Sequence, residues 1–247
     1  MLRFLCVLVA VTTGNTAQSQ KVTPAKAFGM REEIQQISLS PAGDRVAFLS
    51  ATGARGSTLY IVDLGTNAAS AVPKAILRGS GDPEQIYSCN WISEARLICN
   101  AGEVKRDGDA MRGLTRLFAI NADGSDLKRL STRQGMYADY NANFGGAIID
   151  LLPGSNGEVL LGRQYVPEGR VGSLIEKRNE GYGVDQVNTV SLVSKRIVRP
   201  LYNASEFISD GVGNVRVIGS NFEATGGYSE TKTRYAYRSV GKENWEP

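Results

Sequence analysis

Two cysteines lie in the middle of the chain at a spacing that allows them to cross-link. Cys89 and Cys99 flank the short polar run Ser93-Glu94-Ala95, and each is five residues from Glu94. If a β-hairpin turns at Glu94, the two cysteines are directly opposite, with Cβ atoms about 4.5–5.5 Å apart. A disulfide needs a Cβ separation of about 3.8 Å, which a closely spaced antiparallel pair can reach. The spacing predicts a Cys89–Cys99 disulfide, and two buried free thiols are the alternative.

The residue types of the chain exclude the usual serine-hydrolase chemistry. The 247 residues include no histidine, so the chain cannot supply the imidazole base of a Ser-His-Asp triad. The segment most similar to a Gly-x-Ser-x-Gly nucleophile elbow is Gly-Tyr-Ser-Glu-Thr at 227–231, in which Thr231 replaces the last glycine. The strained turn of such an elbow tolerates this replacement poorly. We therefore expect no catalytic residue and interpret 227–231 as a surface loop.

The sequence offers no convincing metal or cofactor site. The run Asn-Ala-Asp-Gly-Ser-Asp at 121–126 faintly resembles a calcium loop, but Thr132 stands at the twelfth position, where such a loop needs a bidentate acid. A turn of type I or I′ between two strands is the better interpretation. Without histidine, a zinc site would need unusual carboxylate ligands. We expect no metal and no cofactor.

The N-terminus resembles a secretory signal peptide. Arg3 precedes the apolar run Phe4–Val11, and small polar residues follow. This order predicts a signal peptide over 1–17, cleaved near Ala17, and a buried N-terminal strand is the alternative. The run is shorter than the roughly 20 apolar residues of a membrane span. We therefore expect a periplasmic or secreted protein with no membrane span after cleavage, in a compartment where disulfides persist.

The charge of the chain gives no sign of a nucleic-acid partner. Lys and Arg exceed Asp and Glu by only three residues, and no dense basic stripe stands out. A protein that binds nucleic acid through its phosphates normally carries such a stripe. We expect no nucleic-acid binding.

Four similar units follow one another along the chain. Each has an apolar strand, a turn rich in Gly, Pro, Asp or Asn, a second apolar strand, an irregular stretch and a third strand. Matching first-strand positions are Ile37, Tyr87, Ile149 and Phe207, at steps of 50, 62 and 58 residues. Such periods are typical of repeat folds, and four strands per unit indicate the blades of a β-propeller, which must stack to bury their faces. An irregular β-sandwich is the alternative.

We therefore predict an all-β fold, a partial β-propeller of about four four-stranded blades preceded by a signal peptide. The predicted divisions are a signal peptide over 1–17, a lead-in segment over 18–33 and a propeller fragment over 34–247, with blades at about 34–80, 86–133, 147–204 and 206–247. The last unit lacks a fourth strand, which suggests a fragment of a longer protein. In the third unit, the third strand is predicted over 187–193, before a further run over 196–201.

The repeat also predicts which turns and side chains share a position. The turns between first and second strands should lie on one rim, and they are Pro41–Asp44, Ser93–Ala95, Pro153–Gly157 and Asp210–Asn214. Apolar strand residues should point between blades; these are Ile37, Ala47, Leu49, Tyr60, Val62, Trp91, Leu97, Phe118, Ile149, Leu160, Ile208, Val217 and Tyr235.

Several of these motifs resemble a known family. Ser40–Phe48 (SPAGDRVAF) is similar to the SPDG-x-x-[IV]-A-[FY] hairpin of TolB-like and peptidase propellers, and Leu59–Leu64 is similar to the LYVVDL strand that follows it. With Asn121–Ser125 and Asp210–Arg216, they resemble the N-terminal propeller of bacterial serine peptidases of the prolyl oligopeptidase (S9) family. Within it, dipeptidyl-aminopeptidase and acylaminoacyl-peptidase-like members are the most similar. The resemblance covers residues 28–247.

The resemblance implies a gating role and no catalysis by this chain. In that family the propeller precedes an α/β-hydrolase domain and covers its active site, so that mainly short peptides enter. The implied partners are a C-terminal hydrolase domain of the parent chain, absent from this sequence, and peptide substrates. Some family propellers hold a substrate amino terminus with neighbouring glutamates, but Glu32-Glu33 lies in the polar lead-in and is interpreted as solvated. The alternative is a stand-alone TolB-like periplasmic propeller that binds a protein or ligand.

Overall fold

The computed structural model describes residues 23–53, 55–65, 71–131, 135–140, 142–169, 179–223, 229–242 and 244–247. The predicted signal peptide over 1–17 and Thr132 lie outside these residues. The chain divides into two compact units, 1–31 and 32–247. In the first unit, the described residues form the short helix α1 (Pro24–Phe28), which the sequence did not predict. No helix in the described part of the chain has the length and apolarity needed to cross a membrane.

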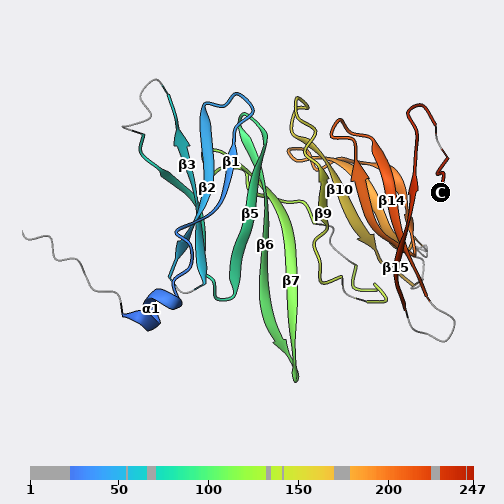
Figure 1. The fold of residues 1–247 in the computed structure, drawn as a ribbon, viewed down its shortest axis with the longest axis horizontal. Helices are drawn as coiled ribbons and strands as arrows, with labels where there is room; N and C mark the ends of the chain where they lie inside the picture. Colours follow the sequence, from blue (N-terminus) through green and yellow to red (C-terminus); the bar gives the residue numbers. More distant parts are fainter. Residues whose placement is uncertain are drawn as a thin grey trace, which may run out of the picture. The chain divides into compact units, whose positions relative to one another are not determined.

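The described residues of the second unit form four antiparallel sheets that follow one another along the chain (Figure 1). The first sheet contains β1 (Ile34–Leu39), β2 (Arg45–Thr52), β3 (Gly56–Asp63) and β4 (Lys74–Gly79). The second contains β5 (Glu84–Ser93), β6 (Arg96–Asp107), β7 (Ala110–Asn121) and β8 (Lys128–Arg129). The third contains β9 (Ala147–Asp150), β10 (Glu158–Tyr165), β11 (Gly181–Asn188) and β12 (Ser194–Leu201). The fourth contains β13 (Ala204–Ser209), β14 (Val215–Glu223) and β15 (Ser229–Tyr237).

Each sheet packs on the next through an apolar cluster, so the second and third sheets are buried on both faces. Leu97 and Ile98, adjacent on β6, belong to different clusters: Leu97 joins the first and second sheets, and Ile98 joins the second and third. On β10, Leu161 faces the second sheet and Leu160 faces the fourth. Successive antiparallel meanders that stack face to face are the blades of a propeller, so the predicted all-β propeller fold is confirmed. The alternative of a two-sheet sandwich is wrong.

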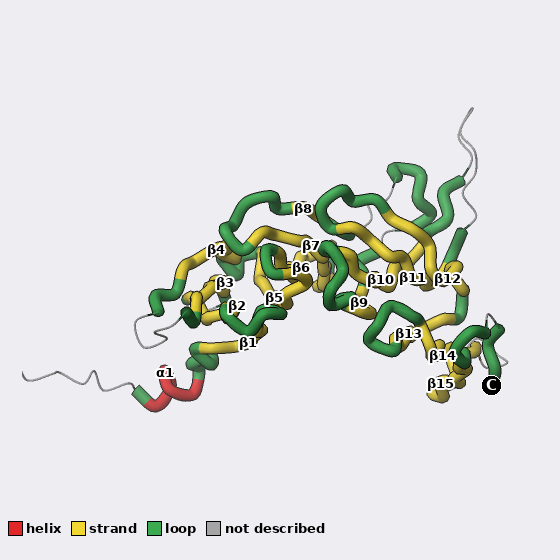
Figure 2. Tube along the Cα trace, turned by 90° about the horizontal axis from the view of Figure 1, so that it is seen from above, coloured by secondary structure: helices red, strands yellow, loops and turns green. Residues whose placement is uncertain are grey.

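The turns between the first and second strands occupy equivalent positions in all four sheets, as predicted. They join β1 to β2, β5 to β6, β9 to β10 and β13 to β14, and they lie at the upper ends of the sheets in Figure 1. From above, the first strands β1, β5, β9 and β13 lie along one side of the row of sheets, and β4 and β8 lie along the other (Figure 2). We refer to the edge that carries these four turns as the rim.

Six residues predicted to lie between blades lie on the outer faces of the first and fourth sheets instead, and they are Ile37, Tyr60, Val62, Ile208, Val217 and Tyr235. Ile37, Ile208 and Tyr235 are 62%, 45% and 55% exposed. Ile37 pairs with Phe48, which places it on the face of the first sheet opposite the buried Leu49. Ile208 and Tyr235 likewise lie on the face of the fourth sheet that points away from the third. The prediction assumed a neighbouring sheet on both sides of every blade, and the outer faces of the first and fourth sheets have none within the described residues.

The strand predicted over 187–193, in the region of the third sheet, is also wrong. β11 covers 181–188, and the apolar residues Val190 and Val193 lie in the turn that follows it. The side-chain oxygen of Asn188 accepts the backbone N–H groups of Val190 and Ser191, at 3.0 and 2.8 Å, and this local bonding favours a turn over a strand.

The true strand begins with a glycine that its packing requires. A Cβ atom on Gly181 would lie 2.3 Å from the backbone oxygen of Leu201 on β12, and its φ is +108°. Only glycine adopts this conformation readily and leaves room for the neighbouring strand. The glycine weakens the strand signal in the sequence, which is why the pattern placed the strand too late.

Candidate functional site at the rim

A cavity of about 420 Å³ lies at the rim, where residues from all four sheets meet. Pro41 comes from the first sheet's turn, Trp91 from β5, Pro153 from the third sheet's turn and Gly211 from the fourth sheet's turn. The remaining lining residues are Ile92, Ile148, Ile149, Asp150, Leu151 and Ser209. The wall is mostly apolar, so it can hold an apolar side chain or a short peptide segment by shape and desolvation.

Trp91 is fixed by contacts with the first sheet. Its indole Nε1–H donates to the carbonyl oxygen of Ser38 at 3.1 Å, and its backbone N–H donates to the Ser38 hydroxyl at 3.3 Å. The Arg45 guanidinium carbon lies 5.0 Å from the centre of the indole ring, a favourable cation–π distance. These contacts hold the indole against β1 and make it a rigid part of the cavity wall.

Asp150 is the one carboxylate among the described residues that line the cavity, and its hydrogen bonds serve the fold. Its Oδ1 accepts the backbone N–H of Leu152, and its Oδ2 accepts the backbone N–H of Gly213, both at 3.0 Å. The side chain is buried and joins β9 to the turn between β13 and β14. A carboxylate whose two oxygens both accept backbone donors is a positioning group here, because it fixes the third and fourth sheets at the rim.

The first and second turns are joined in a similar way. Glu94 Oε1 accepts the backbone N–H of Ala42 at 2.6 Å, and Glu94 Oε2 lies 3.4 Å from Arg45 Nη2. Arg45 Nη2 also donates to the backbone oxygen of Glu94. The turn between β1 and β2 is therefore bonded directly to the turn between β5 and β6.

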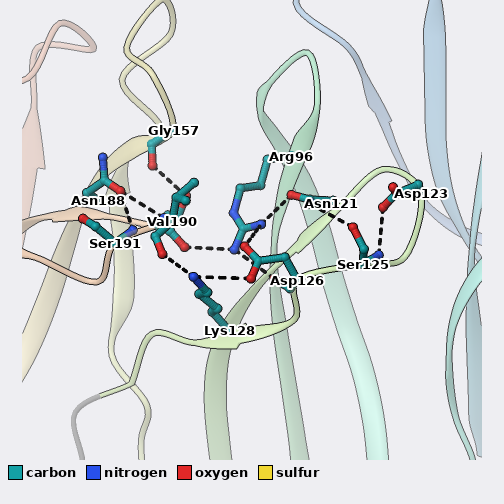
Figure 3. Close-up of polar contacts among 11 residues, drawn as sticks. Arg96, Asn121, Asp123, Ser125, Asp126, Lys128, Gly157, Asn188, Val190 and Ser191 are labelled. Carbon is teal, nitrogen blue, oxygen red and sulfur yellow. Dashed lines mark hydrogen bonds and ion pairs between the residues drawn. The ribbon is translucent and has the colours of Figure 1, made fainter.

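A buried arginine joins the second sheet to the third next to the rim (Figure 3). Arg96 is 2% exposed, and its Nη1 donates to Asn121 Oδ1 at 2.5 Å and lies 3.0 Å from Asp126 Oδ2. Its Nη2 donates to the backbone oxygens of Asp126 at 3.1 Å and Thr189 at 2.9 Å. Lys128 adds a second link, because its Nζ lies 3.3 Å from Asp126 Oδ1 and donates to the backbone oxygen of Val190.

The run 121–126, which faintly resembles a calcium loop, forms a turn in which both carboxylates are used. Asp123 Oδ1 accepts the backbone N–H of Ser125 at 2.8 Å, and hydrogen bonding from Ser125, first through its side chain, lowers the pKa of Asp123. The Gly124 N–H donates to the Asn121 oxygen at 2.9 Å, which closes a β-turn. Asp126 is held by Arg96 and Lys128. The predicted turn between strands is therefore what this run forms.

The two cysteines lie opposite each other and are bonded. Cys89 on β5 pairs with Cys99 on β6, their Cα atoms are 4.1 Å apart, and the S–S distance is 2.04 Å. Both residues are fully buried in the cluster between the first and second sheets. The hairpin turns at Glu94 and Ala95, as the symmetric spacing predicted. A disulfide buried among apolar side chains is structural.

The structure describes two other segments that the sequence singled out, one of them in part. The elbow-like segment over 227–231 lies partly outside the described residues, and from Ser229 onward the chain is β15, with no strand-to-helix turn. Glu32 and Glu33 are exposed ahead of β1, and the Glu33 backbone oxygen accepts the N–H of Ala51 at 3.1 Å.

Sequence reasoning missed Arg96 and the rim cavity. A charged residue at the start of the apolar run Arg96–Cys99 was a signal for the first, because a buried strand seldom begins with an unpaired charge. The cavity has no such signal, since its walls come from segments far apart in the chain.

Comparisons with known proteins return structural similarity only. No protein-family model matches the chain, and no curated protein sequence matches it at a significant level. Among solved structures, the chain is similar to the β-propeller domain of the Trilobed protease from Pyrococcus furiosus, with 13% identity, 86% of this chain and 56% of that chain covered, and a TM-score of 0.43. It is also similar to an acylaminoacyl peptidase from Pyrococcus horikoshii, with 12% identity, 84% and 31% covered, and a TM-score of 0.44.

A third similar structure is TolB from Acinetobacter baumannii, with 14% identity, 86% of this chain and 41% of that chain covered, and a TM-score of 0.38. The chain therefore spans between 31% and 56% of the lengths of these three proteins.

Proposed function

We propose that this chain is the non-catalytic propeller part of an exported serine peptidase of the prolyl oligopeptidase family, of the bacterial dipeptidyl-aminopeptidase or acylaminoacyl-peptidase type. Its role is to admit short peptides to an α/β-hydrolase domain in the same polypeptide and to hinder larger ones. The proposal is supported by the family-like hairpin and strand motifs, by the stacked blades and by a sequence that contains no histidine.

The rim cavity is the observation that carries the proposal. The family-like hairpin over 40–48 contributes Pro41 to its wall, and the other three sheets complete it. The polar side chains beside the cavity, those of Asp150, Ser209 and Trp91, are already bonded within the fold. Such a surface sorts ligands by size and apolar fit, which is the task of a gate, and takes no part in proton transfer.

A tryptophan at the rim tests the gate in the native polypeptide. Pro41→Trp narrows the cavity, whereas Pro73→Trp adds the same bulk next to β4, outside the cavity lining. We expect Pro41→Trp to lower kcat/KM for a peptide of about fifteen residues by about tenfold or more, with less than about a twofold change for a dipeptidyl chromogenic substrate. The Pro73→Trp control should leave both values unchanged.

Two results would contradict the gate. Equal losses for long and short substrates in Pro41→Trp would show a general defect in place of size selection. A native polypeptide that hydrolyses neither substrate would favour the second function class, a stand-alone propeller that binds a protein or ligand.

A further inference from the structure

A second, smaller cavity lies between the second and third sheets, and three arginines are among the residues that line it. Its volume is about 50 Å³, and its walls include Arg116 from β7, Arg129 from β8 and Arg163 from β10. Ser131, Gly145 and Gln164 complete most of the lining. None of these six residues lines the rim cavity.

Arg163 is held rigidly at this cavity. It is 14% exposed, its Nη1 donates to Asp185 Oδ2 at 3.0 Å, and its Nη2 donates to the Leu130 backbone oxygen at 2.9 Å. Asp185 also accepts the Tyr165 hydroxyl at 2.6 Å; burial first, and then this bond, raises the pKa of Tyr165 and keeps it a donor. The buried Nε of Arg163 has no hydrogen-bond partner within the described part of the chain.

Arg116 and Ser131 leave further donors for a ligand. Arg116 Nη1 donates to the backbone oxygens of Thr115 and Asn143, at 2.6 and 3.2 Å, and neutral carbonyls leave its charge uncompensated. The Ser131 oxygen accepts the Leu117 N–H at 2.7 Å, so the hydroxyl proton can be donated elsewhere. The site is tightly built, because a Cβ atom on Gly145 would lie 2.4 Å from the Ser131 oxygen.

The charges around the cavity leave an excess of positive charge. Guanidinium groups remain ionised at any physiological pH; Asp185 balances the charge of Arg163, whereas the oxygens bonded to Arg116 belong to neutral carbonyls. Glu103 lines the larger neighbouring cavity together with Arg116 and Arg129, but it lies 2.8 Å from Lys105, another cation. Guanidinium forks match the oxygens of carboxylate and phosphate groups better than any other side chain does.

From this geometry we propose that the cavity between the second and third sheets binds one small oxyanion, a phosphate, a sulfate or a carboxylate group. A volume of this size holds about three to five water molecules, which is the space of one such group and too small for a nucleotide. The anion would be held by Arg116 and Arg163, with the Ser131 hydroxyl as a neutral donor. Its presence would join β7 to β10 and stabilise the contact between the two sheets.

The test measures anion-dependent stability of the purified exported protein. We expect phosphate to raise the melting temperature in a saturable manner, beyond the effect of chloride at equal ionic strength. Arg116→Gln should weaken the apparent affinity by about tenfold or more. Arg112→Gln, which removes the same charge from the exposed part of the same strand, is the matched control and should bind phosphate as the unmodified protein does.

Further arms identify the source of the anion and guard against misfolding. Competition with glutarate and with its uncharged diamide shows whether a carboxylate can occupy the site. If it can, glutarate should compete with phosphate and the diamide should not. If Arg116→Gln does not fold, Arg116→Lys, which keeps the charge and removes the guanidinium fork, replaces it. A shift that matches chloride at equal ionic strength, or an equal loss of affinity in Arg112→Gln, would overturn the proposal. The outcome is independent of the peptidase assignment, since no hydrolysis is measured.

Discussion

Arg96 Nη2 lies 2.9 Å from the backbone oxygen of Thr189, so a side chain of the second sheet closes the end of the third. Thr189 is itself bonded to Gly157, to which both its N–H and its hydroxyl donate, at 3.0 and 2.7 Å. One chain of hydrogen bonds therefore runs from β6 through the turn after β11 to the start of β10. This guanidinium group joins the two blades together with Lys128 and the apolar cluster between them.

Removal of the Arg96 charge should destabilise the protein strongly. Arg96→Met leaves the Thr189 carbonyl without its donor and leaves Asp126 with Lys128 as its remaining cation. The loss of one partner of a buried ion pair costs about 3–5 kcal/mol, and we expect the lower end of this range because the Asp126 side chain is 36% exposed. Arg112→Met removes an arginine whose pair with Asp107 is exposed at 2.6 Å, so we expect a loss within about 0.5 kcal/mol. Urea unfolding measures both. Similar losses for the two variants would contradict a specific role for Arg96.

The disulfide should contribute measurably to the stability of the oxidised protein. The bond closes a loop with a sequence separation of 10, for which loop entropy predicts a contribution of about 2–3 kcal/mol. Reduction should shift the urea midpoint of the unmodified protein and leave that of a Cys89→Ala, Cys99→Ala variant unchanged. Alkylation of the unfolded but unreduced protein, followed by mass measurement, is the second readout. Two alkylated sites before reduction would show free thiols.

Acid should weaken the rim turn that contains Asp210. Its carboxylate accepts the Asn214 side-chain and backbone N–H groups at 2.9 and 3.0 Å and the Arg216 Nε at 2.9 Å. The bond from the Asn214 side chain is the largest cause that holds the pKa of Asp210 far below its ordinary value. A lowered folded pKa means that the stabilisation is complete above the unfolded value of about 3.9 and is lost as the pH falls below it.

Asp210→Asn should therefore show a smaller loss of stability between pH 5 and pH 2 than the unmodified protein. Asp109→Asn, at an exposed carboxylate in the turn between β6 and β7, is the control and should keep the original dependence. Urea midpoints across this pH range provide the measurement. An Asp210→Asn profile parallel to that of the unmodified protein would show that the turn does not depend on this carboxylate.

Neighbouring residues on a strand of the second sheet should be equally important for stability. Leu97 and Ile98 are both fully buried, on opposite faces of β6. Replacement of either by Ala should cost about 2–5 kcal/mol, because each leaves a cavity in a different cluster. Ile37→Ala, on the exposed face of the first sheet, should cost less than about 1 kcal/mol. A small effect at Leu97 or Ile98 would mean that one face of this sheet is open.

The hairpins were accessible from the sequence because their signals are local. Turn residues between two apolar runs identified all four rim turns, and the equal distance of Cys89 and Cys99 from Glu94 identified their pairing. Both patterns depend on residues within about ten positions of one another. Stacking of the units followed from the repeat, since blades with two apolar faces need neighbours.

Local patterns in the sequence could not show which face of a sheet is exposed or which distant residues are in contact. Ile37 and Leu49 are both apolar strand residues, and only the arrangement of the sheets shows that the first faces outward and the second faces another sheet. Arg96 and Thr189 are 93 residues apart, so no local pattern links them. The start of β11 could not be recognised in the sequence because it is a glycine, Gly181. The close approach of β12 leaves no room for a side chain at that position, so a residue typical of strands is absent there.

The most direct test of the account is labelling with a fluorophosphonate that reacts with active serine nucleophiles. The isolated chain should remain unlabelled and should not hydrolyse aminoacyl or dipeptidyl chromogenic substrates, because it has no histidine base. The native polypeptide, captured with an antibody against residues 32–247, should be labelled at one serine outside this sequence. Stoichiometric labelling of a serine within the isolated chain, or a native polypeptide that carries no label, would contradict the assignment as a peptidase propeller.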